Sequence, residues 1–143
     1  FHKRKFVPNN PQKYTGDITN IIMRSSWETK FAVWCDTNPS VIQWKSEEVV
    51  VPYICGTDNK IHRYYIDFQI KVKTKENLVK TYLVEIKPAK QTVPPVFPGK
   101  QTKRYLEESY AFIKNQSKWK AAKLYAKERG WEFIIITERE LGL

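Results

Sequence analysis

Two acidic residues and one lysine lie in two neighbouring runs that are rich in strand-forming residues. Asp67 lies in the run 64–70, and Glu85 and Lys87 lie at the end of the run 82–87. Carboxylates are the ligands that Mg²⁺ and Mn²⁺ prefer, and an ammonium group beside them can hold a phosphate. If folding brings these side chains onto one face, they can hold a divalent cation and a water next to a phosphate. An ordinary surface ion pair between Asp67 and Lys87 is the alternative interpretation.

The residues around this set predict a β-hairpin that brings the two acids together. A short turn-like stretch, 74–78, separates the runs, and a hairpin centred on Glu76 pairs Asp67 directly with Glu85. Under that pairing one face is apolar and the other is polar, with Leu83 as the exception. A slip by one residue would mix the two faces. Two carboxylates that face each other without a cation repel, which favours a bound metal.

The composition favours a polyanion as the partner. The chain has 143 residues and a formal net charge of +10, from 25 Lys and Arg against 15 Asp and Glu. Such an excess of positive charge favours nucleic acid first and an anionic membrane surface second. The length is that of one domain with one core. No apolar run approaches the roughly 18 residues that a membrane span requires, so a membrane-spanning protein is excluded.

The cysteines and histidines predict no further chemistry. Cys35 and Cys55 are the two cysteines and His2 and His62 the two histidines, and their spacing fits neither a zinc site nor a disulfide framework. We therefore expect two buried or half-buried thiols, no metal cluster of His and Cys, and no pair of nucleophile and base.

The chain divides into a short arm and one domain. Residues 1–20 are basic at the start and then rich in Asn and Pro, so we expect a poorly ordered arm before a single domain over residues 21–143. The first helix of that domain begins at Ser25, which fits a capping box with Glu28, and ends at Asn38. Its apolar face is formed by Trp27, Phe31, Trp34 and Cys35.

Strand and helix patterns alternate over the rest of the chain. We expect strands at 41–44, 47–53, 61–73, 79–87 and 131–137, a Pro-rich loop at 88–101 and a long helix over 101–129. The last strand is a continuous apolar run, typical of a strand buried on both faces. The buried side of the long helix is expected to comprise Leu106, Tyr110, Ile113, Ala121 and Leu124. A buried strand after a long crossover helix implies an α/β fold, with a mixed β-sheet flanked by helices.

The set of Asp67 followed by Glu85-x-Lys87 resembles the catalytic signature of the PD-(D/E)xK nucleases, the restriction-endonuclease-like superfamily. Further motifs resemble the endonuclease subunit of heteromeric transposases, the TnsA type. They are the helix opening at 25–28, the runs 48–53, 63–68 and 85–88, and a helix with Gln116 and Lys120 followed by 130–131 and 136–138. One departure is Ile66, because the family usually has Pro before the first Asp. Pro shapes the backbone there but binds no metal.

The resemblance implies a restriction-endonuclease-like fold and a metal site. Asp67, Glu85 and the backbone carbonyl of Ile86 would bind Mg²⁺ or Mn²⁺. Glu28 would be an additional acid that approaches the metal from the first helix. A helix-capping role for Glu28 needs no catalysis and is the alternative.

The resemblance also implies roles for polar residues around the metal. Lys87 would position the attacking water or help to deprotonate it, and Gln116 would be a supporting polar group on the long helix. Solvent-facing positions for Gln116 and Lys120 are the alternative. The basic residues expected to contact DNA are Lys90, Lys100, Lys103, Arg104, Lys118, Lys120 and Lys123.

The implied activity is Mg²⁺-dependent endonucleolytic hydrolysis of double-stranded DNA with little sequence specificity; exonuclease activity is left open. The similarity is strongest to a phage-encoded branch of the family and covers the chain from about Pro8 to its end. That branch implies trimming of packaged DNA during head completion and head–tail joining, in the cytoplasm of the bacterial host or in the virion. Portal or neck proteins of the phage head and a second copy of the chain are the expected partners. A structural DNA-binding head-completion factor and a transposase-type subunit that needs a partner are the alternatives.

Overall fold

The computed structural model describes residues 2–143, and Phe1, the first residue of the predicted arm, lies outside the described residues. The strands are β1 (Arg4–Lys5), β2 (Ile22–Met23), β3 (Val41–Ser46), β4 (Val50–Ile54), β5 (Ile61–Tyr65), β6 (Phe68–Lys73), β7 (Val79–Ile86) and β8 (Glu132–Ile136). The α-helices are α1 (Ser26–Thr37), α2 (Lys103–Glu128) and α3 (Glu138–Leu141). Among the helices of residues 2–143, none is long and apolar enough to cross a membrane.

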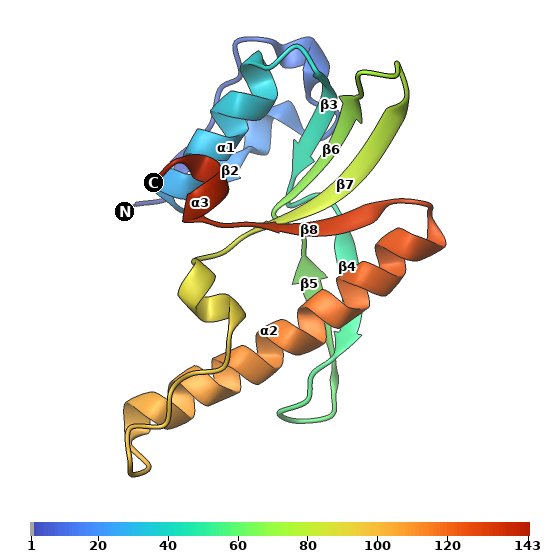
Figure 1. Ribbon diagram of the computed structural model, residues 1–143. Coiled ribbons are helices and arrows are strands. Elements are labelled where there is room, and N and C mark those ends of the chain that lie inside the picture. Colours follow the sequence, from blue (N-terminus) through green and yellow to red (C-terminus); the bar gives the residue numbers. More distant parts are fainter. Residues whose placement is uncertain (1) are drawn as a thin grey trace.

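A four-stranded sheet in the order β3-β6-β7-β8 forms the centre of the molecule (Figure 1). Its first three strands pair antiparallel, and β8 joins parallel to β7 after the α2 crossover. Val84 and Ile86 pack in the cluster that contains α1, whereas Leu83 packs in the cluster that contains α2. Because successive strand residues point to opposite faces, α1 and α2 cover opposite faces of β7. The predicted mixed sheet flanked by helices is confirmed.

The register of the predicted hairpin is confirmed. The pairing of β6 with β7 runs from Lys73 opposite Val79 to Phe68 opposite Val84, so the next residues in this register are Asp67 and Glu85. The face that carries these acids is not open to water as the sequence suggested, because α2 covers it. That cover explains why the apolar Leu83 lies on it.

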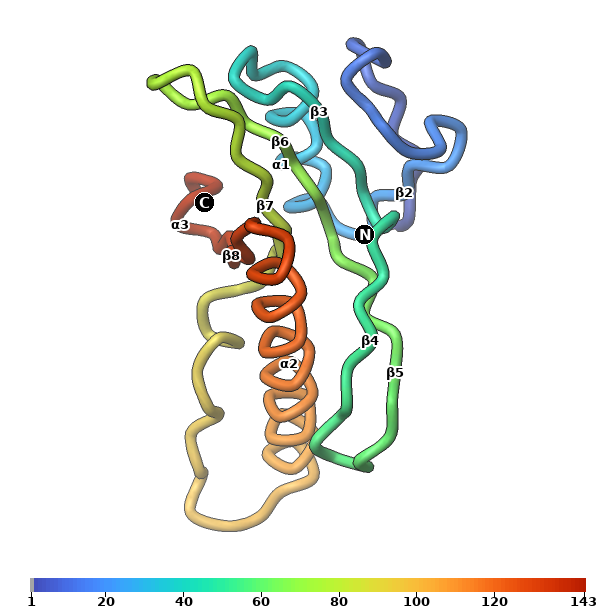
Figure 2. The backbone as a smooth tube through the Cα atoms, turned by 90° about the vertical axis from the view of Figure 1, so that its right-hand side faces the viewer, coloured from blue at the N-terminus to red at the C-terminus, as the bar shows by residue number. Residues whose placement is uncertain are grey.

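The predicted strand over 61–73 is two strands in the structure. β5 pairs antiparallel with β4 in a separate two-stranded ribbon, whereas β6 enters the central sheet. The chain bends at Ile66 and Asp67, where the Ile66 N–H donates to the Val49 carbonyl at 3.0 Å. The alternation of side chains continues through the bend, so the sequence pattern carried no sign of it. Figure 2 shows the ribbon of β4 and β5 extending away from the central sheet.

Residues 2–20 pack against the domain and do not form the poorly ordered arm that their composition predicts. β1 pairs with β2, and the buried ring of Tyr14 lies with its centroid 4.7 Å from that of Trp44. The Tyr14 hydroxyl accepts a hydrogen bond from the Ser46 N–H at 3.1 Å. The Asp36 carboxylate accepts two more from backbone N–H groups of residues 9 and 10. A core aromatic and a buried acid therefore hold this segment in place.

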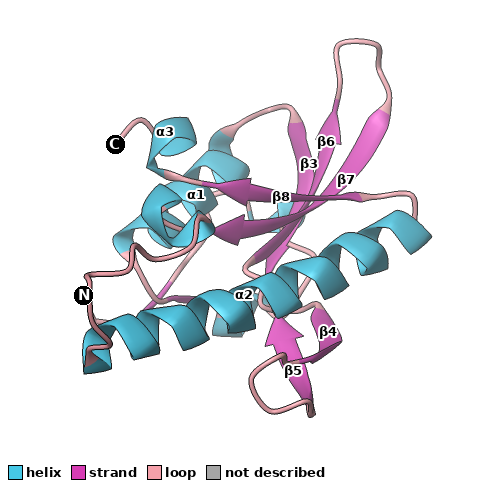
Figure 3. Ribbon diagram, turned by 60° about the horizontal axis from the view of Figure 1, so that its bottom comes forward, coloured by secondary structure: helices cyan, strands magenta, loops and turns pink. Residues whose placement is uncertain are grey.

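The helices bury some of the predicted residues and leave others exposed. Phe31 and Cys35 are buried, and Trp27 and Ala121 are partly buried, as expected. α1 buries Phe31, Ala32 and Cys35 together with Glu28 and Asp36, while Trp34 remains 42% exposed. In α2 the buried residues are Trp119, Ala122 and Ala126. The predicted buried residues Leu106, Tyr110, Ile113 and Leu124 are exposed. Leu106, Tyr110 and Ile113 are exposed because the first half of α2 projects beyond the sheet, beside the loop of residues 88–102 (Figures 1 and 3).

The last strand is half-buried rather than buried on both faces as predicted. β8 lies at the edge of the sheet and pairs on one side with β7. Its apolar side chains still pack against both hydrophobic core clusters. Ile134 and Ile136 lie on the α1 side of the sheet, and Phe133 and Ile135 lie on the α2 side.

Replacement of Tyr14 by Ala tests the packing of the N-terminal segment. Loss of the ring and of its hydroxyl contact with Ser46 should lower the free energy of unfolding by about 3 to 5 kcal/mol. Urea denaturation of the variant measures this. Val7→Ala in the same segment, at an 82% exposed side chain, should change stability by less than about 0.5 kcal/mol. Equal, small effects of the two changes would contradict the observed packing.

Candidate active site

Asp67 lies in the bend between β5 and β6, beside the end of β7. Its carboxylate Oδ2 accepts a hydrogen bond from the Ile86 N–H at 2.8 Å, and its carbonyl accepts one from the Glu47 N–H at 3.2 Å. Burial, followed by the charge of Glu85, raises the pKa of Asp67 well above its usual value, and the charge of Glu28 raises it further. The structure thus brings Asp67 close to both other predicted acids.

Glu85 lies on β7 with both carboxylate oxygens in contact with partners. The Tyr64 hydroxyl donates to Oε2 at 2.5 Å, and the Lys87 ammonium lies 3.5 Å from Oε1. Glu85 is only 6% exposed, and burial together with the Glu85 charge raises the pKa of Tyr64 above its usual range, so its phenol keeps the proton that it donates. The predicted pairing of Glu85 with Lys87 on one face is present. Tyr64, three residues before Asp67, is a partner of the site that the sequence analysis did not name.

Glu28 approaches the site from the start of α1. Its N–H donates to the Ser25 hydroxyl at 3.1 Å, which confirms Ser25 as the N-cap. Its carboxylate accepts hydrogen bonds from the Arg24 N–H and the Ser25 hydroxyl, both at 3.2 Å. The carboxylate therefore binds the N–H one residue earlier than a capping box would. Burial raises the pKa of Glu28, so its role as a cap does not remove it from the cluster of acids.

Lys118 reaches the site from α2, on the face opposite to α1. Its ammonium lies 5.3 Å from the centre of the Tyr64 ring. Burial lowers the pKa of Lys118, whereas the carboxylates of Glu85 and Asp67 act in the opposite direction. Opposite charges shift each other's pKa only at short range, so the Lys118 ammonium lies near both carboxylates. The sequence analysis predicted Lys118 as a DNA contact, and the structure places it nearer to the acids than the other predicted α2 residues.

Gln116 and Lys120 face another part of the surface. Both are exposed and line a hollow of about 1050 Å³ between α2 and the β4–β5 ribbon, together with Lys123. Two residues along an α-helix differ by about 200° in direction, so Gln116 and Lys120 lie on the side of α2 away from Lys118. The structure therefore does not bring Gln116 to the carboxylates.

The remaining predicted DNA contacts gather near the first half of α2. Lys90 and Arg104 line a hollow of about 690 Å³ between the Pro-rich loop and α2. Arg104 and Lys103 pair along the helix with Glu108 and Glu107, and Lys100 is exposed in the loop. This basic group lies apart from Lys87 and Lys118.

The oxygen donors of Asp67 and Glu85 fit Mg²⁺ or Mn²⁺. Both cations prefer carboxylate ligands, and a cation between two buried carboxylates would relieve their repulsion. Ile86, whose carbonyl is the predicted third ligand, lies between Glu85 and Lys87 and holds Asp67 through its N–H. In the described residues the ligand oxygens of Glu28, Asp67 and Glu85 do not all lie within 4.8 Å of one another, so the three acids do not form one compact set of ligands.

A second group of side chains with metal-ligand atoms departs from the expectation that the cysteines and histidines form no cluster. Cys55, Asp58 and His62, at the far end of the β4–β5 ribbon, each offer a ligand atom within 4.8 Å of the other two. The spacing Cys-x₂-Asp-x₃-His across a turn was the available signal. The analysis missed it because it considered only spacings of Cys and His.

Comparisons with known proteins agree with the geometry of the site. A family model described as TnsA-like endonuclease N terminal matches residues 38–138, a range that contains Asp67, Glu85 and Lys87 but not Glu28. The head completion nuclease of Enterobacteria phage T4 is 43% identical over 145 residues, which cover 96% of this chain and 94% of that protein. No solved structure matches the chain.

Replacement of Asp67 by Asn tests whether the two carboxylates strain the fold. Removal of one buried negative charge should raise the free energy of unfolding by roughly 0.5 to 2 kcal/mol in EDTA, as is common when a functional site is relaxed. Mg²⁺ should stabilise the unsubstituted protein but not Asp67→Asn. Urea denaturation with and without Mg²⁺ measures both effects. Glu76→Gln, in the exposed hairpin turn, should show neither, and a destabilised Asp67→Asn protein would contradict the interpretation.

Proposed function

Because the chain belongs to the TnsA-like endonuclease family, we propose that it is a metal-dependent DNA nuclease whose hydrolytic centre is Asp67, Glu85 and Lys87. The observation that carries the proposal is the meeting of these side chains at the ends of β6 and β7, with Glu85 buried and Asp67 partly buried. Nuclease activity is the common element of the family description and of the name of the phage relative. The residues, the cation and the substrate are what the proposal adds.

The hydrogen bonds of the site orient the two carboxylates. The Ile86 N–H binds Oδ2 of Asp67, and the Tyr64 hydroxyl binds Oε2 of Glu85. A cation would bind the other oxygen of each acid, and at Glu85 it would share Oε1 with the Lys87 ammonium. A bound Mg²⁺ or Mn²⁺ would polarise the phosphoryl group and lower the pKa of a bound water. The Ile86 carbonyl and Glu28 complete the proposed set of oxygen ligands.

Lys87 and Lys118 flank the carboxylates on the α2 side. Lys87 lies beside Glu85 Oε1, where its ammonium can orient the attacking water and stabilise the negative charge that develops on the phosphate. Lys118, held over the Tyr64 ring, can hold a phosphate next to the one that is cut. Both side chains are partly buried, so their charges act more strongly than those of exposed lysines.

The substrate that the charge favours is double-stranded DNA bound through its backbone. A net charge of +10 supplies sequence-independent affinity that falls steeply with salt. The predicted contacts on α2 and the Pro-rich loop would extend the interface beyond the site. The name of the phage T4 relative supports a role in head completion, in which a packaged DNA end is trimmed before the head joins the tail. Portal or neck proteins and a second copy of the chain are the proposed partners.

Cleavage of supercoiled plasmid tests the centre. The purified protein should nick DNA in Mg²⁺ or Mn²⁺ but not in EDTA. Glu85→Gln, which keeps an acceptor for Tyr64, should reduce the rate at least about 100-fold, since a catalytic metal supplies several kcal/mol of stabilisation. DNA binding by the variant in a gel-shift assay should change less than about twofold, and Glu76→Gln should cleave normally.

The outcomes separate the proposal from its alternatives. DNA binding without cleavage in any metal would overturn the proposal in favour of a structural factor or of a subunit that needs its partner. Undiminished cleavage by Glu85→Gln would leave a nuclease but refute this centre.

Paired replacements on α2 test which helix residue serves the centre. Lys118→Met keeps the apolar part of the side chain but removes the charge, and should slow cleavage by about 10- to 100-fold. It should also reduce the salt slope of DNA binding by about 1. Lys120→Met and Gln116→Ala, on the other side of the helix, should leave the single-turnover cleavage rate within about threefold. A larger loss in Gln116→Ala than in Lys118→Met would restore the role that the sequence predicted for Gln116.

A further inference from the structure

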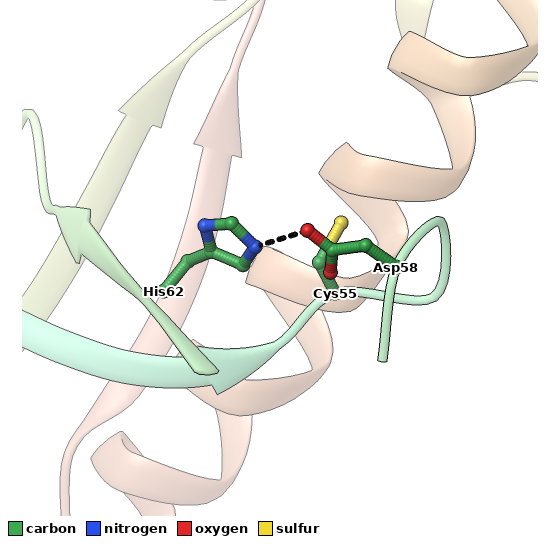
Figure 4. Close-up of side chains that lie close together, drawn as sticks. All are labelled: Cys55, Asp58 and His62. Atoms are coloured by element: carbon green, nitrogen blue, oxygen red, sulfur yellow. Dashed lines mark hydrogen bonds and ion pairs between the residues drawn. The ribbon is translucent and has the colours of Figure 1, made fainter. Parts of the chain in front are cut away.

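The turn between β4 and β5 brings together a thiol, a carboxylate and an imidazole (Figure 4). The ligand atoms of Cys55, Asp58 and His62 lie within 4.8 Å of one another, and His62 Nε2 is 2.8 Å from Asp58 Oδ2. Asp67 lies beyond the opposite end of β5. It is five residues from His62, or roughly 16 Å along an extended strand. The cluster is therefore separate from the nuclease centre.

We propose that Cys55, Asp58 and His62 bind one Zn²⁺ ion at the tip of the β4–β5 ribbon. Thiolate, imidazole and carboxylate are the three ligand types that zinc accepts in proteins, and a water can fill the fourth position. The thiolate distinguishes this set from the oxygen ligands at Asp67 and Glu85. Mg²⁺ does not favour sulfur, so the two sites select different cations.

The backbone of the turn holds the ligands in place before any ion arrives. Cys55 accepts a hydrogen bond from the Asn59 N–H at 2.8 Å and donates its own N–H to the Lys60 carbonyl at 3.0 Å. Asn59 has a φ of 57°, the left-handed conformation that lets the turn close. Asp58 Oδ1 accepts from the Lys60 N–H at 2.9 Å, so that Oδ2 is directed toward His62. Little conformational entropy then remains to be lost on binding.

Small rotations of exposed side chains would complete a tetrahedral site. Zinc–ligand bonds of about 2.0 to 2.3 Å place ligand atoms about 3.3 to 3.7 Å apart in a tetrahedron. The imidazole and the carboxylate are closer than this, and the other separations reach at most 4.8 Å. Asp58 is exposed and His62 half-exposed, so both can move and an ion can enter, whereas the buried Cys55 supplies the fixed ligand.

An ion pair between Asp58 and His62 accounts for only two of the three side chains. It does not include the Cys55 sulfur, which lies where the core on the α2 side reaches the turn and contacts the Thr57 hydroxyl at 3.0 Å. The turn is also tied to α2, because the Gly56 N–H donates to the Ser117 hydroxyl at 3.0 Å. A zinc ion there would fix the tip of the ribbon against the helix that carries Lys118.

Titration of the full chain with Co²⁺ and Zn²⁺ tests the proposal. Co²⁺ bound to a thiolate gives a ligand-to-metal charge-transfer band in the near ultraviolet, which an all-oxygen site does not give. The band should saturate at one Co²⁺ per chain and disappear when one equivalent of Zn²⁺ is added. No thiolate band in the unsubstituted protein would overturn the proposal before any variant is made.

Matched variants locate the site. Cys55→Ala and His62→Gln should lose the band and weaken Zn²⁺ binding more than about 100-fold, beyond the loss typical for the hydrogen-bond partners of ligands. His62→Gln changes a partly exposed residue and should remain folded by circular dichroism. Cys35→Ala, at the other buried cysteine, and Asp67→Asn, at the nuclease centre, should keep the band. Loss of the band in Cys35→Ala, or its persistence in Cys55→Ala, would refute the assignment.

Discussion

The antiparallel pairing of β6 with β7 determines where the two carboxylates lie. The other contacts of the site offset part of the free-energy cost of placing two like charges side by side. The register that pairs Phe68 with Val84 continues to Asp67 beside Glu85, at a position that α2 covers. Two buried carboxylates repel, and burial without compensation would cost several kcal/mol. Hydrogen bonds from Ile86 and Tyr64 offset part of this cost. The Lys87 ammonium, 3.5 Å from Glu85 Oε1, offsets more of it, and a divalent cation between the two acids would do the same.

The hairpin could be predicted because its constraints are local. Alternating side chains over two neighbouring runs permit one register, and the short turn around Glu76 leaves no other pairing of comparable quality. Asp67, Glu85 and Lys87 were therefore placed correctly relative to one another. The N-cap at Ser25 was predictable for the same reason, since a cap depends on only four consecutive residues.

The parts that depend on packing between distant segments could not be predicted. The buried side of α2 is set by how far the helix projects past the sheet, which no periodicity within the helix records. Lys118, rather than Gln116, lies near the acids because the two residues point in directions about 200° apart around α2. The sequence pattern did not indicate the break between β5 and β6, because the alternation of buried and exposed side chains continues through it. Tyr14 was assigned to a poorly ordered arm because its neighbours in the sequence are polar. In the structure its ring packs against the ring of Trp44.

The β4–β5 ribbon connects the two sites mechanically. At one position Tyr64 on β5 binds Glu85 through its hydroxyl and supports the Lys118 ammonium with its ring. At the tip of the ribbon Gly56 binds Ser117, the neighbour of Lys118 on α2. If the tip moved relative to α2, the hydrogen bond between Gly56 and Ser117, next to Lys118, would be strained or lost. A metal ion that stiffens the tip would therefore preserve the charge arrangement around the hydrolytic centre without taking part in its chemistry. The ribbon also supplies Val51, Tyr53 and Tyr64 to the core on the α2 side of the sheet, so its position and the packing of α2 depend on each other.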